Sequence, residues 1–178
     1  MKKFIVSLLT LIFVLGISIP AFASTTESST NKFYFRNEVD QNLNCDGDTY
    51  ALASNVKIGG VVKGDIITAA KSLDITAENV EGSIRAAATT IDIASKSVRN
   101  ITLVGQTINI SKNTVSKGVY IIGEKIAFDG ITDEIKAVGR EIILNGTIKG
   151  NVNVECDKLI IGKNAKIDGT INVKSTQE

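Results

Sequence analysis

Short runs of alternating apolar and polar residues recur along most of the chain. The first apolar pair is Val56 and Ile58, and the first members of the later pairs follow at steps of 17, 18, 17, 18, 16 and 17 residues. The later pairs are Leu73/Ile75, Ile91/Ile93, Ile108/Ile110, Ile126/Phe128, Ile142/Leu144 and Leu159/Ile161. This alternation is the period of a β-strand with one buried face. The pattern therefore predicts strands that return at a nearly constant spacing.

Two further apolar positions recur with the same spacing. A corner position is read at Val62, Val80, Val98, Val115, Ile131, Ile148 and Ile167. A third strand is read from Ile66, Ile84, Ile101, Val119, Ile135, Val152 and Ile171. A period this short leaves no room for a helix, so each unit is one coil of a parallel β-solenoid. We expect an all-β, single-domain parallel β-helix over residues 39–175, with about eight coils stacked about 4.8 Å apart, dry inside and polar outside.

The repeat also predicts where the glycines and cysteines lie within each coil. Gly64 and Gly82 follow a corner residue by two, as expected where the backbone needs a positive φ or a close approach. Cys45 falls in the corner set and Cys156 at the end of a third strand, several coils apart. Such a separation exceeds the roughly 7 Å between Cα atoms that a disulfide allows. We expect two buried thiols, with an intermolecular thiol as the alternative.

The first 23 residues have the pattern of a secretory signal. Lys2 and Lys3 precede an apolar run over 4–19 that is short for a bilayer span, and Ala21-Phe22-Ala23 suits signal peptidase. We expect a signal peptide over 1–23, with an uncleaved anchor as the alternative, and a secreted or extracytoplasmic location at the cell surface or envelope. No transmembrane segment is expected after cleavage.

A polar lead-in is expected over 24–38 and a short tail over 176–178. The lead-in contains the aromatic stretch Phe33-Tyr34-Phe35. These side chains either cover the first open end of the repeat array or bind a partner.

Composition excludes several classes of function. The chain has no histidine, which removes the common Ser-His and Cys-His catalytic sites and disfavours a hexapeptide acyltransferase. The coils are too short to wall the carboxylate-lined groove of a polysaccharide lyase or hydrolase. Cleavage after residue 23 leaves 20 − 2 = 18 basic against 19 acidic residues, a balance that does not favour nucleic acid. We expect no enzyme activity, no cofactor and no nucleic-acid partner.

Glycine-containing corners carry a family resemblance. Gly47-Asp48, Gly64-Asp65-Ile66, Gly82-Ser83-Ile84, Gly150-Asn151-Val152 and the closing stretch 159–169 resemble the bactofilins, bacterial polymer-forming proteins, and their secreted relatives. The resemblance covers roughly residues 42–175. It implies a right-handed parallel β-helix and nucleotide-independent polymerisation end to end. The signal peptide departs from the usual cytoplasmic bactofilins and favours an envelope or surface scaffold.

Two groups of apolar residues are candidate contact sites. Ala127, Ile143 and Ile160 fall at outward positions on neighbouring coils and are a candidate lateral contact, with ordinary β-branched packing as the alternative. The last coil has no helix or proline cap, and uncapped β edges pair with other chains. The candidate end-coil contacts are Leu159, Ile161, Ile167, Ile171 and Val173.

The same outward ladder carries charges in its first half. Lys57 lies beside Asp74 as a candidate surface ion pair, and Asp74 lies beside Asp92. Two neighbouring carboxylates attract a cation such as Ca²⁺, but two solvated carboxylates are the favoured interpretation, so no metal site is expected.

These features predict a secreted structural protein that associates with itself end to end. The product is a nucleotide-independent filament or a cell-envelope scaffold. The alternative is an adhesin-like binding module, a monomeric β-helix that presents a lateral face to an envelope protein or a glycan. Tyr120 is one of few outward aromatics, which weakens the case for a glycan. Assembly of the mature chain by itself distinguishes the two functions.

Overall fold

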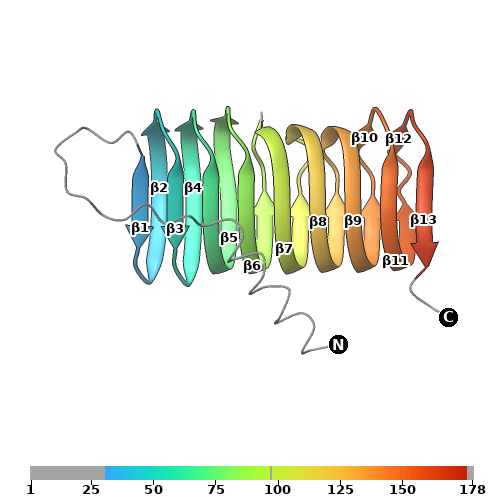
Figure 1. Cartoon of the computed structure of the whole chain (residues 1–178), viewed down its shortest axis with the longest axis horizontal. Coiled ribbons are helices and arrows are strands. Elements are labelled where there is room, and N and C mark those ends of the chain that lie inside the picture. Colours follow the sequence, from blue (N-terminus) through green and yellow to red (C-terminus); the bar gives the residue numbers. More distant parts are fainter. Residues whose placement is uncertain (1–30, 97, 176–178) are drawn as a thin grey trace.

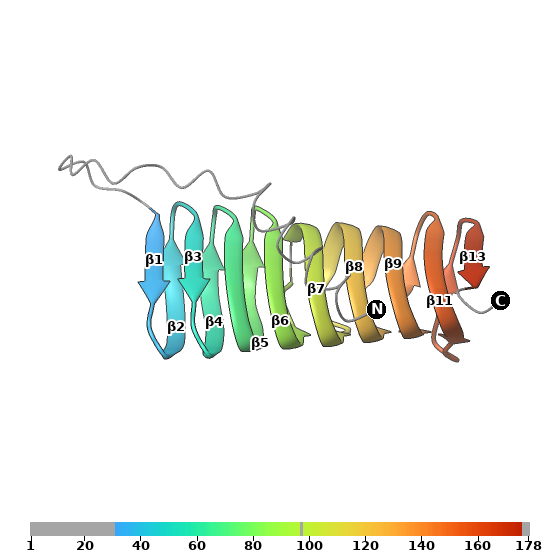
Figure 2. The same ribbon diagram turned by 60° about the horizontal axis from the view of Figure 1, so that its bottom comes forward.

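The computed structural model describes residues 31–96 and 98–175, which form a parallel β-solenoid of about eight coils (Figure 1). The predicted fold class is confirmed. β1 lies at one end of the solenoid and β13 at the other, and Figure 2 shows the coils stacked between them. The predicted signal peptide over 1–23 and the tail over 176–178 lie outside the described residues.

The strands follow one another with short corners between them. They are β1 (Lys32–Phe35), β2 (Glu38–Cys45), β3 (Thr49–Leu52), β4 (Asn55–Val62), β5 (Ile66–Val80), β6 (Ile84–Ile93), β7 (Val98–Ile110), β8 (Val115–Phe128), β9 (Ile131–Leu144), β10 (Thr147–Ile148), β11 (Val152–Ile161), β12 (Lys166–Ile167) and β13 (Ile171–Ser175). Every pairing between them is parallel. The longer strands bend at a corner, so that β5 pairs with both β3 and β4.

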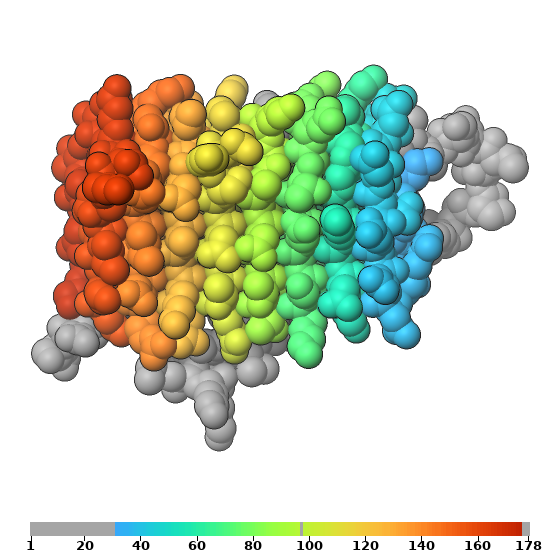
Figure 3. Space-filling model, turned by 180° about the vertical axis from the view of Figure 1, so that it is seen from behind, coloured from blue at the N-terminus to red at the C-terminus, as the bar shows by residue number. Residues whose placement is uncertain are grey.

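The pairing register confirms the predicted repeat on two faces of the solenoid. On the first-strand face Val56 pairs with Leu73, and Leu73 with Ile91. On the third-strand face Ile66 pairs with Ile84, and Ile84 with Ile101. Equivalent residues of successive coils therefore form ladders along the rod, and Figure 3 shows the coils as successive bands from the first to the last.

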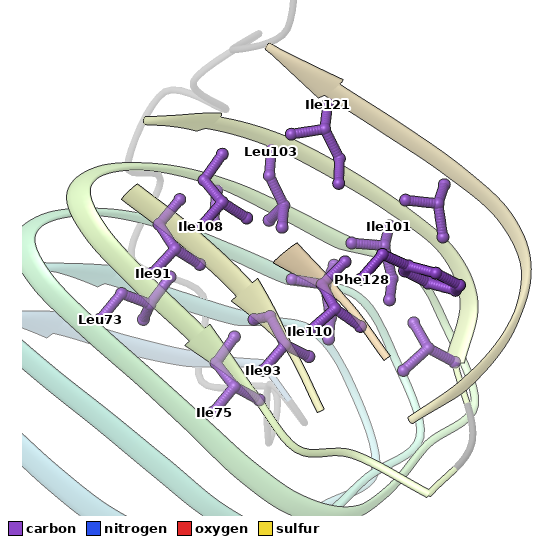
Figure 4. Packing of buried hydrophobic residues seen from close by; sticks show 14 of the residues in the cluster. Leu73, Ile75, Ile91, Ile93, Ile101, Leu103, Ile108, Ile110, Ile121 and Phe128 are labelled. Atoms are coloured by element: carbon purple, nitrogen blue, oxygen red, sulfur yellow. The ribbon is translucent and has the colours of Figure 1, made fainter. Parts of the chain in front are cut away.

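The interior is filled by the inward residues of these ladders. Ile91, Ile108 and Phe128 are at most 1% exposed, and Phe128 is the largest buried side chain. Figure 4 shows residues of both faces, among them Ile110 and Leu103, pointing into the same narrow core. Each coil covers its neighbour, so the core is continuous along the rod although one coil alone has little apolar surface to bury.

The structure corrects the predicted inward corner residue in two coils. Val115 and Ile131 were expected to point inward, but Val115 is 41% exposed and Ile131 is partly exposed. The neighbouring Ser116 and Thr132 occupy the inward positions, 5% and 0% exposed. The hydroxyl of Thr132 donates to the carbonyls of Lys117 and Glu134 at 3.3 and 3.0 Å, so its burial leaves it hydrogen-bonded. The interior is therefore not wholly apolar.

The first strand begins earlier than the sequence suggested. Lys32–Phe35 was expected to be an irregular lead-in, but it is β1 and pairs in parallel with β3. Tyr34 lies opposite Ala51 and packs against the core, whereas Phe33 stacks on Tyr50 with ring centroids 4.8 Å apart. The aromatic stretch thus adds a strand to the first coil.

The glycine corners are sites of close approach between coils. A Cβ atom at Gly64 or Gly82 would lie closer than 3.0 Å to the backbone of the preceding coil. Positive φ is found among the described glycines only at Gly60, so close approach is the reason for the two corner glycines.

A hydrogen-bonded ladder of side chains runs beside these corners. Asn31 accepts from the Asp48 amide at 2.9 Å, Asp48 from the Asp65 amide at 2.8 Å, and Asp65 from the Ser83 amide at 2.8 Å. Near the other end, Asn151 accepts from the Thr170 amide at 3.0 Å. Each carboxylate or amide oxygen thereby connects one coil to the next, which explains why Asp and Asn follow corner glycines.

The two cysteines lie where the register places them. Cys45 pairs with Val62 on the corner ladder and Cys156 with Gly139 on the third-strand face. They are 1% and 3% exposed and do not form a disulfide with each other.

Candidate assembly surfaces

The last coil exposes side chains that are buried at the same positions one coil earlier. Ile161, Ile171 and Val173 are 47%, 41% and 53% exposed. Their ladder partners are Leu144, Val152 and Val154, which are 0%, 0% and 4% exposed. Leu159 and Ile167 are partly buried and pack against the core. The predicted end-coil residues therefore lie together on the inner side of one open end.

The backbone at this end is also available for pairing. Within the described residues, β13 pairs with β11 alone and β12 with β10 alone. At the opposite end, and again among the described residues only, β1 pairs with β3 alone and β2 with β4 alone. Its core is better covered, because Val39 and Cys45 are 1% exposed. The two ends of the rod are therefore unlike, and the C-terminal one is the more open.

The predicted lateral strip forms a continuous ladder. Ala127 pairs with Ile143, and Ile143 with Ile160, on the outer side of the first-strand face. All three side chains are partly buried. The structure brings these residues together, and their role as a lateral contact stays a prediction.

The charged half of the same ladder brings the two predicted carboxylates onto neighbouring coils. Lys57 lies beside Asp74, and Asp74 beside Asp92. The pKa of Asp74 is raised, chiefly because the side chain is partly buried. The charge of Lys57 lowers this pKa, but the charges of Asp92 and Asp40 raise it. Asp92 accepts a hydrogen bond from Asn109 at 2.8 Å. Among residues 31–96 and 98–175, no three His, Cys, Asp or Glu side chains gather in a way that would hold a metal ion.

Sequence reasoning missed a long apolar row on the side of the rod. It is the outer row of the third-strand face, where apolar residues occupy seven successive coils, and we call it the third-strand stripe. Its residues are Phe35, Leu52, Ala69, Ala87, Val104, Ile122 and Val138. Glu155 follows on the next coil and ends it. Part of the signal was in the sequence, because the last five of these residues each come three positions after the start of a third strand.

A shallow groove of about 600 Å³ lies over the C-terminal half of this face. Val104, Ile122 and Val138 line it together with Tyr120 and Lys136. The Tyr120 hydroxyl donates to Glu134, and the ammonium of Lys136 lies 5.4 Å from the centre of the Tyr120 ring. The groove is therefore apolar along the stripe and polar along one side.

The described part of the chain has no helix long and apolar enough to cross a membrane. Comparisons of the chain with family models, with curated proteins and with solved structures gave no match. The resemblance to bactofilins consequently stays a prediction that rests on the residues quoted for it.

Proposed function

We propose that this protein is a structural protein that associates with itself end to end. The product is a nucleotide-independent filament or scaffold, of the kind that the bactofilin resemblance implies. The proposed place of this scaffold is outside the cytoplasm, at the cell surface or envelope, because the sequence begins with the pattern of a secretory signal.

The open C-terminal end is the observation that supports this function. Ile161, Ile171 and Val173 occupy core positions but are 41–53% exposed. A further coil supplied by another chain would cover them as the preceding coils cover their ladder partners. Burying the exposed half of such a side chain is worth on the order of 1 kcal/mol. The free strand edges add backbone hydrogen bonds to the same contact.

Light scattering and negative-stain microscopy on the purified protein test the proposal. The measurements are made without nucleotide over a range of concentrations. We expect filaments or long rods from the wild type and short particles from Val173→Lys, because the lysine places a charge on the open end. Val115→Lys is the matched control, since Val115 is also 41% exposed but lies on a corner in the middle of the rod.

A wild-type protein that stays a short monomer at high concentration would overturn self-assembly. It would favour the binding-module alternative, in which the rod presents a lateral face to an envelope protein or a glycan. Filaments that survive Val173→Lys unchanged would show that the open end is not the contact.

A further inference from the structure

The third-strand stripe is an unusual surface for the side of a rod. Phe35 and Leu52 are 66% and 47% exposed at one end of it, and Ile122 and Val138 are 38% and 45% exposed at the other. The outward positions of a β-sheet face that meets only water are normally polar. An uninterrupted apolar row of this length indicates a surface that another molecule covers.

The side chains of the stripe are larger toward its two ends than near its middle, although matched positions differ in size, since Phe35 corresponds to Val138 and Ala69 to Val104. Large residues lie at both ends, and Ala87 stands at the centre with three stripe residues on each side. A row that is bulky at both ends and small near its middle can pack against a copy of itself turned end for end. This is the condition for a two-fold symmetric contact, in which the same patch of both subunits meets itself.

We propose that a second copy of this chain lies alongside the first, antiparallel to it, with the two third-strand stripes in contact. A two-fold axis beside Ala87 places Phe35 of each copy opposite Val138 of the other and Leu52 opposite Ile122. Ala69 then faces Val104. The small residues at the centre allow the two sheets to approach, and the larger ones fill the ends.

The neighbouring outward row is compatible with this arrangement. The same axis places Phe33 of one copy near Lys136 of the other and Tyr50 near Tyr120, which are a cation–π pair and an aromatic pair. Arg85 lies nearest the axis and would meet its own copy. Its guanidinium is already paired with the carboxylate of Asp65 on the preceding coil, which reduces the repulsion.

The size of the surface fits a reversible pair. Seven strands spaced at about 4.8 Å, each contributing about 15 Å of its length, cover on the order of 500 Å² per copy. The total of about 1,000 Å² is at the lower limit of specific interfaces. Association is therefore expected to depend on concentration. The contact is independent of the proposed end-to-end contact, because it uses the side of the rod.

Sedimentation equilibrium with the full purified protein tests the pair. All variants carry Val173→Lys, so that end-to-end association does not contribute. Ile122→Lys or Val138→Lys should weaken dimerisation at least about tenfold, since a lysine charge would be desolvated without a partner. Val115→Lys is the control, as an exposed valine away from the stripe, and should leave dimerisation unchanged. Circular dichroism checks that each variant keeps its strands.

A charge pair across the interface tests the antiparallel register. Leu52→Glu alone should weaken the dimer as Ile122→Lys does. The double variant Leu52→Glu/Ile122→Lys should restore it, because each glutamate then faces the lysine of the other copy. Within one chain the two positions are four coils apart, about 19 Å, so an intramolecular pair is excluded.

Three results would overturn the proposal. They are a Val173→Lys protein that remains monomeric at millimolar concentration, dimerisation that Ile122→Lys and Val138→Lys do not change, and a double variant no better than its single parents. A monomer in this background with filaments in the wild type would reject the lateral pair and leave the end-to-end proposal standing. A dimer in this background without wild-type filaments would reject the end-to-end proposal and leave the lateral pair standing.

Discussion

Replacing Asp65 with alanine is expected to break the connection between two coils. Its Oδ1 atom accepts a hydrogen bond of 2.8 Å from the backbone amide of Ser83, a residue that is 4% exposed. A buried amide that loses its acceptor costs about 1–3 kcal/mol. The ion pair between Asp65 and the half-exposed Arg85 adds at most about 1 kcal/mol. We therefore expect Asp65→Ala to lower the free energy of unfolding by about 1–4 kcal/mol.

Asp65→Asn is the matched variant, because asparagine keeps the acceptor oxygen and removes only the charge. Asn151 makes the equivalent hydrogen bond to Thr170 at 3.0 Å, which shows that an amide fits this corner. The asparagine variant should lose about 1 kcal/mol or less. Urea denaturation followed by circular dichroism measures both values. Equal losses in the two variants would refute the reasoning, because the charge pair and not the backbone connection would then carry the effect.

The same pair of proteins gives a pH dependence. Burial raises the pKa of Asp65, but hydrogen bonds from the Ser83 amide and from Arg85, with the charges of Arg85 and Arg99, outweigh it and leave the pKa below its usual 3.8. A carboxyl group whose pKa is lowered by folding stabilises the protein above its unfolded pKa, and this contribution is lost as the pH falls through the folded value. The stability difference between wild type and Asp65→Asn should therefore shrink below about pH 4.

Three further outcomes are expected. Phe128→Ala should reduce the free energy of unfolding by about 3–5 kcal/mol in the same urea experiment, because the ring is 0% exposed and its loss leaves a cavity. Ile143→Lys with Ile160→Lys should leave the circular dichroism spectrum unchanged, and unaltered assembly in light scattering would reject the lateral strip of Ala127, Ile143 and Ile160 as a contact. Burial raises the pKa of the Cys156 thiol and the side chain is 3% exposed, so a thiol reagent should modify it much faster in denaturant than in buffer.

The repeat could be recognised in the sequence because the core determines which positions must be apolar. An inward position must be apolar in nearly every coil, so Leu73, Ile91 and Ile108 mark the register without further information. The corners were harder to read. Hydrophobicity favours Val115 and Ile131, but the fold places the adjacent Ser116 and Thr132 inside. The Thr132 hydroxyl donates to the carbonyl of Glu134 in its own corner and to that of Lys117 on the preceding coil, and a hydrogen bond of this kind cannot be recognised from a pattern of apolar residues.

Of the candidate surfaces, too, some could be predicted from the sequence and others could not. The open C-terminal end follows from the last repeat, and Ile171 and Val173 were found from it. The strand at Lys32–Phe35 and the third-strand stripe were missed, although their spacing is that of the repeat. Aromatic residues in a polar segment resemble a loop, and outward positions have no required residue type. The sequence spacing places five of these apolar residues in one row, and the observed pairing adds Phe35 and Leu52 to it.

Because the register between coils is constant, the length of the rod can change independently of its cross-section and its two ends. Ile84, Ile101 and Val119 occupy one position in three successive coils, so removing the segment from Ile84 to Asn100 would bring Ile101 into the place of Ile84. The cross-section and both ends would be the same in the shortened rod, which would lose about 4.8 Å. Duplicating such a segment would lengthen it equally. Duplication or deletion of single coils would thus change the length of the rod in fixed increments of one coil.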